Sequence, residues 1–232
     1  MKYAILAAGD GSRLVQEGET RPKPLIRVGG ETLIDRLLRV FMTNGATEIA
    51  VICNSQMTAV AAYLESIRQM SGIPVRFMVR STPSSMHSLW ELRTWLDDAP
   101  FILTTVDTIF QEQAFFTYVE AFRQLTADGL MGVTDFIDDE RPLYVSTDDT
   151  LRITDFSDTS DQPHYISAGI YGLTPRCFVT LERCIARGEQ RMRNFQRALV
   201  ADGFQLQAWP FSKVLDIDHV SDILKAEQFL SV

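Results

Sequence analysis

The fold of this chain is decided by its opening stretch, Lys2-Tyr3-Ala4-Ile5-Leu6-Ala7-Ala8-Gly9-Asp10-Gly11-Ser12-Arg13. The apolar run from Tyr3 to Ala8 predicts a buried strand. The glycine-rich turn after it lets backbone amides approach an anion closely, and Arg13 adds a charged donor. Glycine also serves ordinary tight turns, so the turn alone does not establish a phosphate site.

The spacing of the glycines disfavours other nucleotide-binding motifs. A dinucleotide-binding turn carries a third glycine that opens a helix at once, whereas Arg13 takes that place and the next helix is expected only near Thr32. The P-loop signature is absent from the sequence. A nicotinamide-dependent dehydrogenase is therefore disfavoured.

Apolar runs alternate with segments of helical period along the chain, which predicts one α/β domain over residues 1–232 with a mostly parallel sheet. Further strands are expected at residues 48–53, 75–80, 101–106, 130–134, 165–173 and 205–211. Helices are expected at residues 32–44, 57–70, 85–96, 111–125, 176–201 with a break at Gly188, and 220–230. Short alternating runs between Asp-rich turns predict a small antiparallel excursion at about residues 136–161.

The amino-acid composition limits the classes of partner that the protein can bind. The 232 residues carry 22 Lys plus Arg against 30 Asp plus Glu, and this net charge of −8 argues against nucleic acid. No stretch approaches the roughly 20 apolar residues of a membrane span. Three cysteines without metal-ligand spacing predict buried thiols in a reducing compartment. We therefore expect a cytoplasmic protein, while the oligomeric state stays open.

A second motif, Pro22-Lys23-Pro24-Leu25, follows the turn. Together the two motifs resemble the N-terminal signature of sugar-phosphate and phosphocholine nucleotidyltransferases. The resemblance implies a Rossmann-like three-layer sandwich with a mixed, mostly parallel sheet, of the nucleotide-diphospho-sugar transferase type. It also implies catalytic roles for Arg13, which grips pyrophosphate, and for Lys23 at the reacting phosphates. The residues that it assigns to nucleotide binding are Ala7, Ala8, Gly9, Gly11, Ser12 and Arg13.

Aspartates at two places complete the predicted site. Asp107 ends the apolar strand at residues 101–106, and open α/β sheets bind ligands beyond the carboxyl ends of their strands. By resemblance to the family, Asp107 binds catalytic Mg²⁺ together with a carboxylate near the C-terminus. Asp216 and Asp218 project from the same side of an extended segment, so both are candidates, and the sequence does not separate them.

Two weaker resemblances concern the ligands. Ser85 and Ser88 open a helix that contacts nucleotide in related cytidylyltransferases, although a plain helix start explains them equally well. Gly169, in Ser167-Ala168-Gly169-Ile170-Tyr171, matches a strand that lines the family's acceptor pocket, with a strand bulge as the alternative.

The acceptor side departs from the family. Residues 154–158 carry no basic residue where the family has a lysine for the sugar phosphate. Lys213 is one substitute, and an ordinary surface lysine is the alternative. The eight aspartates between residues 135 and 161 predict a solvated segment, with a pocket for a cationic head group such as choline as the minority reading.

The predicted function is transfer of a nucleotidyl group from a nucleoside triphosphate to a small phosphorylated acceptor, a sugar 1-phosphate or a phosphocholine-like molecule, with Mg²⁺ as cofactor. The attacking phosphate is already anionic, so catalysis needs positioning and charge neutralisation without a general base. A non-catalytic module that binds nucleotide or sugar phosphate is the alternative. Neither the base nor the acceptor follows from the sequence.

Overall fold

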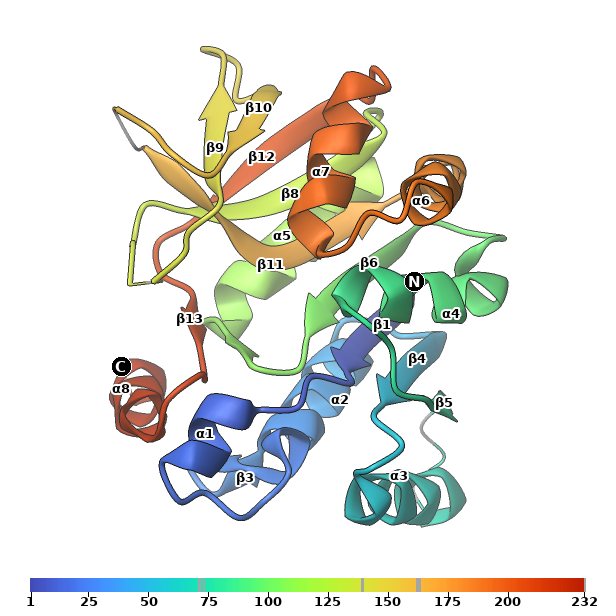
Figure 1. Cartoon of the computed structure of the whole chain (residues 1–232), viewed down its shortest axis with the longest axis vertical. Helices are drawn as coiled ribbons and strands as arrows, with labels where there is room; N and C mark the ends of the chain where they lie inside the picture. Colours follow the sequence, from blue (N-terminus) through green and yellow to red (C-terminus); the bar gives the residue numbers. More distant parts are fainter. Residues whose placement is uncertain (71, 73, 139, 162–163, 232) are drawn as a thin grey trace.

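The computed structural model of the protein describes residues 1–70, 72, 74–138, 140–161 and 164–231 (Figure 1). Its centre is a nine-stranded sheet with the order β10-β9-β11-β6-β1-β4-β5, while β8 pairs with β11 and with β12. The strands are β1 (Lys2–Ala7), β4 (Glu48–Cys53), β5 (Val75–Val79), β6 (Phe101–Thr105), β8 (Gly129–Thr134), β9 (Tyr144–Thr147), β10 (Ile153–Ser157), β11 (Tyr165–Leu173) and β12 (Leu206–Phe211).

Most strands of this sheet point the same way. β6, β1, β4 and β5 form parallel pairs. β8 and β9 share their direction because each is antiparallel to β11, which is itself antiparallel to β6, and β12 is parallel to β8. Only β11 and β10 run the other way. The predicted mixed, mostly parallel sheet is confirmed, and so is the antiparallel β9–β10 excursion.

Helices cover both faces of the sheet and make three layers. One core contains side chains of α2 (Leu33–Thr43), α3 (Thr58–Met70), α5 (Glu112–Gln124) and α8 (Val220–Leu230). The other core contains those of α4 (Ser85–Leu96), α6 (Cys177–Ala186) and α7 (Met192–Ala201). The predicted break lies between α6 and α7. The central parallel strands β1, β4 and β6 are buried on both faces because each face packs against helices, whereas the edge strand β5 is partly exposed.

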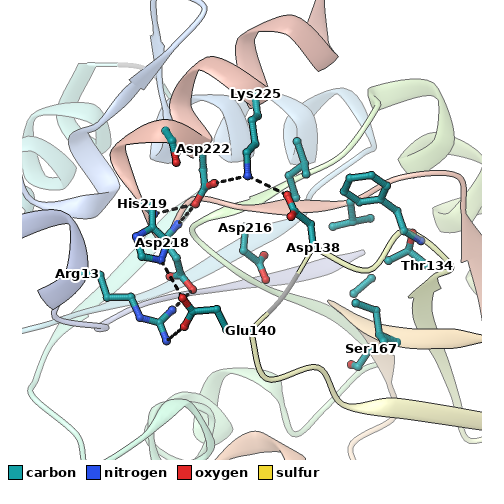
Figure 2. A pocket seen from close by; sticks show the side chains of 16 residues that line it. Arg13, Thr134, Asp138, Glu140, Ser167, Asp216, Asp218, His219, Asp222 and Lys225 are labelled. Atoms are coloured by element: carbon teal, nitrogen blue, oxygen red, sulfur yellow. Dashed lines mark hydrogen bonds and ion pairs between the residues drawn. The ribbon is translucent and has the colours of Figure 1, made fainter. Parts of the chain in front are cut away.

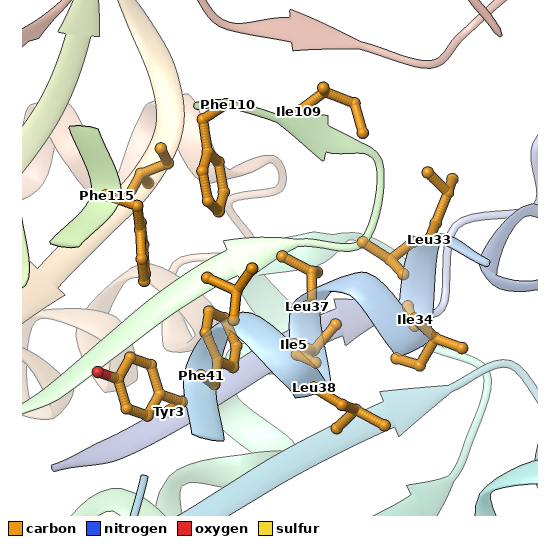
Figure 3. Close-up of a cluster of buried hydrophobic side chains, with 14 of the residues drawn as sticks. Tyr3, Ile5, Leu33, Ile34, Leu37, Leu38, Phe41, Ile109, Phe110 and Phe115 are labelled. Carbon is orange, nitrogen blue, oxygen red and sulfur yellow. The ribbon is translucent and has the colours of Figure 1, made fainter. Parts of the chain in front are cut away.

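Aromatic side chains join β1 to the helices of the first core (Figure 3). Tyr3 on β1 stacks on Phe41 of α2 with ring centroids 4.4 Å apart, and Phe115 of α5 packs beside both rings. The α2 side chains Leu33, Leu37 and Phe41 recur at helical spacing and are all buried. This packing fixes the strand that leads into the glycine-rich turn.

The structure differs from the sequence-based expectation where elements are short. The expectation that no helix begins before Thr32 is wrong, because α1 (Ser12–Gln16) starts directly after Gly11. Gly11 turns the chain at a φ of 61°, and Leu14 anchors the helix in the core. A helix of five residues is too short to show a helical period. The third glycine of the dinucleotide motif is nonetheless missing.

Two small ladders also escaped prediction. β2 (Arg27–Val28) pairs with β3 (Glu31–Thr32), and β7 (Thr108–Ile109) pairs with β13 (Leu215–Asp216). The second ladder brings the C-terminal segment beside the end of β6. Among the described residues, no helix combines the length and the apolar character needed to cross a bilayer.

A substitution at Gly172 tests how closely α5 packs on the sheet. A Cβ at this position would lie 2.7 Å from Cδ2 of Phe122, an overlap with a buried ring that has little room to move. We expect Gly172→Ala to lower the free energy of unfolding by about 1–3 kcal/mol, as for other overpacked cores. Urea denaturation of the two proteins measures the difference, and equal midpoints would contradict this packing.

Candidate active site

The predicted site residues gather beyond the carboxyl ends of β1 and β6, around two hollows of about 230 Å³ each. The first, here called the loop hollow, is lined by Ala8, Gly9, Gly11, Lys23, Ser85 and Asp107, among others. The second, the carboxylate hollow, is lined by Arg13, Asp138, Glu140, Asp216, Asp218 and Lys225, among others (Figure 2).

The loop after β1 carries open space above its backbone. A Cβ on Gly9 would meet no atom within 4 Å, so this glycine is not required by packing. Gly11 adopts the left-handed conformation and lies against the Lys23 side chain. Asn54 steadies the loop, since its Nδ2 donates to Oδ1 of Asp10 at 2.5 Å and to the carbonyl of Ala8 at 3.4 Å.

Lys23 is the most buried cation of the site, with 8% of its side chain exposed. The short helix η1 (Lys23–Leu25) directs its ammonium to Asp107 and Asp218. Nζ lies 2.8 Å from Oδ1 of Asp218 and also pairs with Asp107. Burial disfavours the charged amine, but the attraction of the two carboxylates outweighs it and raises the pKa of Lys23. Lys23 is thus a fixed, permanent cation.

Asp107 and Lys23 stabilise each other's charges. Burial disfavours ionisation of Asp107, but the ammonium of Lys23 and a hydrogen bond from Thr105 prevail and lower the pKa of this carboxyl. Asp107 therefore carries its negative charge at neutral pH. Lys23 is therefore not a solvated surface residue, because the carboxylates hold it inside the site.

Arg13 projects from α1 into the carboxylate hollow. Its Nη1 lies 2.9 Å from Oδ2 of Asp218, and its Nη2 lies 3.2 Å from Oε2 of Glu140. Asp218 thus accepts from both predicted catalytic cations, one on each carboxylate oxygen. Figure 2 shows Glu140 reaching this guanidinium from a different part of the chain.

The turn before α8 is held rigid. Asp222 accepts hydrogen bonds from the backbone amides of Asp218 at 3.2 Å and His219 at 2.8 Å, and a capping box links it to His219. The β7–β13 ladder places Asp216 opposite Thr108, one residue after Asp107. Asp216, Asp218 and Asp107 are therefore brought to one region from distant parts of the chain.

The donor set fits Mg²⁺. The described residues contain no cluster of three or more metal-binding side chains, but Mg²⁺ commonly uses one or two carboxylates and takes its other ligands from substrate phosphates and water. Asp107 and Asp218 converge on one cation, the Lys23 ammonium. Asp216 lines the carboxylate hollow together with Asp218, so both stay candidates for the second carboxylate beside Asp107.

The predicted nucleotide-binding residues divide into two groups. Ala8, Gly9, Gly11, Ser85 and Ser88 line the loop hollow, and Arg13 lines the carboxylate hollow. Ala7, which is almost fully buried, and Ser12 are not among the residues that line either one.

The start of α4 forms the opposite wall of the loop hollow. Ser84 is the N-cap residue by position, but its hydroxyl contacts His87 Nδ1 at 3.0 Å and forms no backbone cap. Ser88 lies 2.6 Å from the hydroxyl of Thr82, which leaves Ser85 as the freer serine of this wall. Contact of either serine with nucleotide stays a prediction.

Gly169 marks an irregularity of β11. Its φ is 71°, and the register of β11 against β8 shifts between Ser167 and Tyr171. A Cβ here would lie 3.1 Å from the hydroxyl of Thr108. This bulge explains the glycine, while its neighbours Ser167 and Ala168 line the carboxylate hollow. Acceptor contact by Gly169 itself stays a prediction.

The first part of the Asp-rich segment lies at the site, whereas the later part does not. Asp138 lies 3.0 Å from Lys225 Nζ at the rim of the carboxylate hollow, whereas Asp158 pairs with Arg193 and Arg197. Position 139 lies outside the described residues. Lys213 is placed over the rings of Phe136 and Phe229 instead of in the hollow, which favours the surface interpretation.

Sequence reasoning missed Glu140, Lys225 and Asn54. Each is an ordinary residue type with no motif around it, and only the fold brings it to the site. The run of aspartates before Glu140 was the one available signal, since a negative segment next to a predicted cationic loop suggests pairing.

Two glycine variants test whether the backbone conformation of the turn requires a glycine at each position. Gly11→Ala forces a left-handed conformation on a residue with a side chain, and we expect it to lower the free energy of unfolding by about 1–2 kcal/mol. Gly9→Ala meets open space and should unfold at the wild-type urea concentration. Equal stability of Gly11→Ala would contradict the described turn.

Comparison with known proteins gives a consistent result. The chain is 23% identical to the low-salt glycan biosynthesis nucleotidyltransferase Agl11 and 25% identical to the UTP--glucose-1-phosphate uridylyltransferase AglF, both of Haloferax volcanii. Each match covers 99% of this chain, which spans 66% of Agl11 and 96% of AglF.

Two solved structures share the fold. The inositol-1-phosphate CTP transferase from T. maritima matches with a TM-score of 0.81 at 19% identity over 100% of this chain and 98% of the other. A putative glucose-1-phosphate thymidylyltransferase from Bacillus anthracis matches with a TM-score of 0.86 at 20% identity over 99% and 94%. Residues 2–231 match the family described as Nucleotidyl transferase. The chain therefore belongs to this family and is a nucleotidyltransferase.

Proposed function

We propose that the protein transfers a nucleotidyl group from a nucleoside triphosphate to a small phosphorylated acceptor and releases pyrophosphate. The observation that carries this proposal is Lys23, a buried cation between Asp107 and Asp218 at the junction of the two hollows. The names of AglF and of the T. maritima structure, which refer to glucose 1-phosphate and inositol 1-phosphate, support an acceptor of this class.

The loop hollow suits the triphosphate. Gly9 and Gly11 present backbone without side chains, and Ser85 offers a hydroxyl from the opposite wall. Arg13 lines the neighbouring carboxylate hollow, and in this proposal its side chain turns toward the outgoing phosphates. In this arrangement the base and ribose lie toward α4, and the α-phosphate lies near Lys23.

In the proposed reaction, an acceptor phosphate oxygen attacks the α-phosphorus in line. The new oxygen–phosphorus bond forms as the bond to the β-phosphate breaks, and pyrophosphate leaves. Lys23 neutralises charge at the reacting phosphates, Arg13 does so on the leaving group, and neither transfers a proton. Bound Mg²⁺, held by Asp107 together with Asp216 or Asp218, would supply further neutralisation.

The carboxylate hollow suits the acceptor. Its lining includes the hydroxyls of Thr134 and Ser167 and the Phe136 ring, together with several carboxylates. Carboxylates and hydroxyls can bind the hydroxyl groups of a sugar or an inositol, and an aromatic ring beside carboxylates can also bind a choline-like cation. The lining is therefore compatible with more than one acceptor, and experiment must identify both the acceptor and the base.

A pyrophosphate-release panel tests the proposal. It crosses CTP, UTP, GTP, TTP and ATP with inositol 1-phosphate, several sugar 1-phosphates and phosphocholine, with and without Mg²⁺. We expect acceptor-dependent release with at least one pair. Nucleotide binding without release for any pair would favour the alternative, a non-catalytic binding module.

Lys23→Ala removes the central cation and should reduce turnover about 100-fold or more, as when other preorganised electrostatic donors are lost. Lys213→Ala is the matched control, because it removes the same charge from a lysine that is itself part of neither lining. Initial rates with the best substrate pair measure both variants. A near-normal rate in Lys23→Ala would refute the assigned role.

Metal binding can be measured without turnover. In the presence of nucleotide, we expect Asp107→Asn, and either Asp216→Asn or Asp218→Asn, to weaken Mn²⁺ binding about tenfold or more, by analogy with losses at other metal sites. Asp138→Asn removes a carboxylate from the rim of the carboxylate hollow and should bind Mn²⁺ as the wild type does. Electron paramagnetic resonance of free Mn²⁺ gives the affinities. Unchanged binding by Asp107→Asn would exclude it as a ligand.

A further inference from the structure

We propose that Glu140 is a positioning residue that competes with pyrophosphate for Arg13 and so promotes release of this product. The inference rests on the proposed function, because it assumes that Arg13 holds the leaving phosphates. It concerns a residue outside the sequence motifs, in the segment between β8 and β9.

Both arms of the Arg13 guanidinium already have carboxylate partners. Nη1 pairs with Asp218 at 2.9 Å and Nη2 pairs with Glu140 at 3.2 Å. A phosphate that forms a bidentate contact with Nη1 and Nη2 therefore competes with these carboxylates for the guanidinium.

Glu140 is the partner that can leave. Its side chain is 62% exposed, and its second contact, His219 Nε2 at 3.6 Å, is long. Asp218, by contrast, is also bound to Lys23 at 2.8 Å and sits on the turn that Asp222 fixes. The contact between Arg13 and Glu140 is thus the exchangeable one, and exposed pairs of this kind contribute about 0.2–1 kcal/mol.

The exchange requires no covalent change at Glu140. Triphosphate binding moves Arg13 from the carboxylate to the β- and γ-phosphates, and base and ribose contacts help to stabilise that state. After the bond between the α-phosphorus and the β-phosphate breaks, pyrophosphate is no longer held through the base and ribose contacts. Glu140 then recaptures Arg13, which weakens pyrophosphate binding and assists its departure.

Calorimetric titration of the wild type and Glu140→Gln with magnesium pyrophosphate and with the triphosphate from the panel tests this inference. We expect Glu140→Gln to bind both about two- to fivefold more tightly, by the same factor, which corresponds to the contribution of an exposed pair.

Two controls separate the Arg13 contact from a general charge effect. Asp138→Asn removes the same charge from the same segment, but its partner is Lys225, so pyrophosphate affinity should stay near that of the wild type. In an Arg13→Ala background, Glu140→Gln should have no further effect, as a double-mutant cycle requires for a direct contact.

The outcomes are distinguishable. Turnover in the panel, with Glu140→Gln binding pyrophosphate as the wild type does, overturns the inference and leaves the proposed function intact. Equal tightening by Asp138→Asn, or persistence of the effect without Arg13, also overturns it. No turnover for any pair and no pyrophosphate binding by the wild type would overturn both.

Discussion

The site depends on one interaction, the buried ammonium of Lys23 between the carboxylates of Asp107 and Asp218. Three parts of the chain, after β1, at the end of β6 and before α8, converge there. A buried carboxylate or amine alone would be driven toward its neutral form, whereas together they remain charged. The arrangement that supports phosphate chemistry therefore also holds these segments in place.

The sequence contained enough information for the architecture and for part of the site. β4, α4, β11 and α8 lie within the predicted bounds because their apolar periods are long and their ends are marked. Asp107 and Lys23 were identified from a strand end and a motif, and the structure brings them into contact. Their proximity could not be read from periodicity, which describes each element separately.

What escaped prediction depends on short or nonlocal contacts. α1 and the β7–β13 ladder contain too few residues for a pattern, and the ladder pairs residues more than one hundred positions apart. Glu140 and Lys225 belong to no motif, and their partners are fixed only by the folded chain. Alternation along an extended segment treats Asp216 and Asp218 alike, and both line the carboxylate hollow, so the choice between them as metal ligand stays open.

The β7–β13 ladder has a consequence for the order in which the site forms during synthesis. Asp218 lies 195 residues from Lys23 and 205 from Arg13, so these contacts close among the longest loops in the chain. A nascent chain that ends before β13 can build β1, β4 and β6 and can place Lys23 beside Asp107, but it lacks the second carboxylate. The catalytic arrangement thus arises only after nearly all of the described chain has left the ribosome, whereas the sheet beneath it can form earlier.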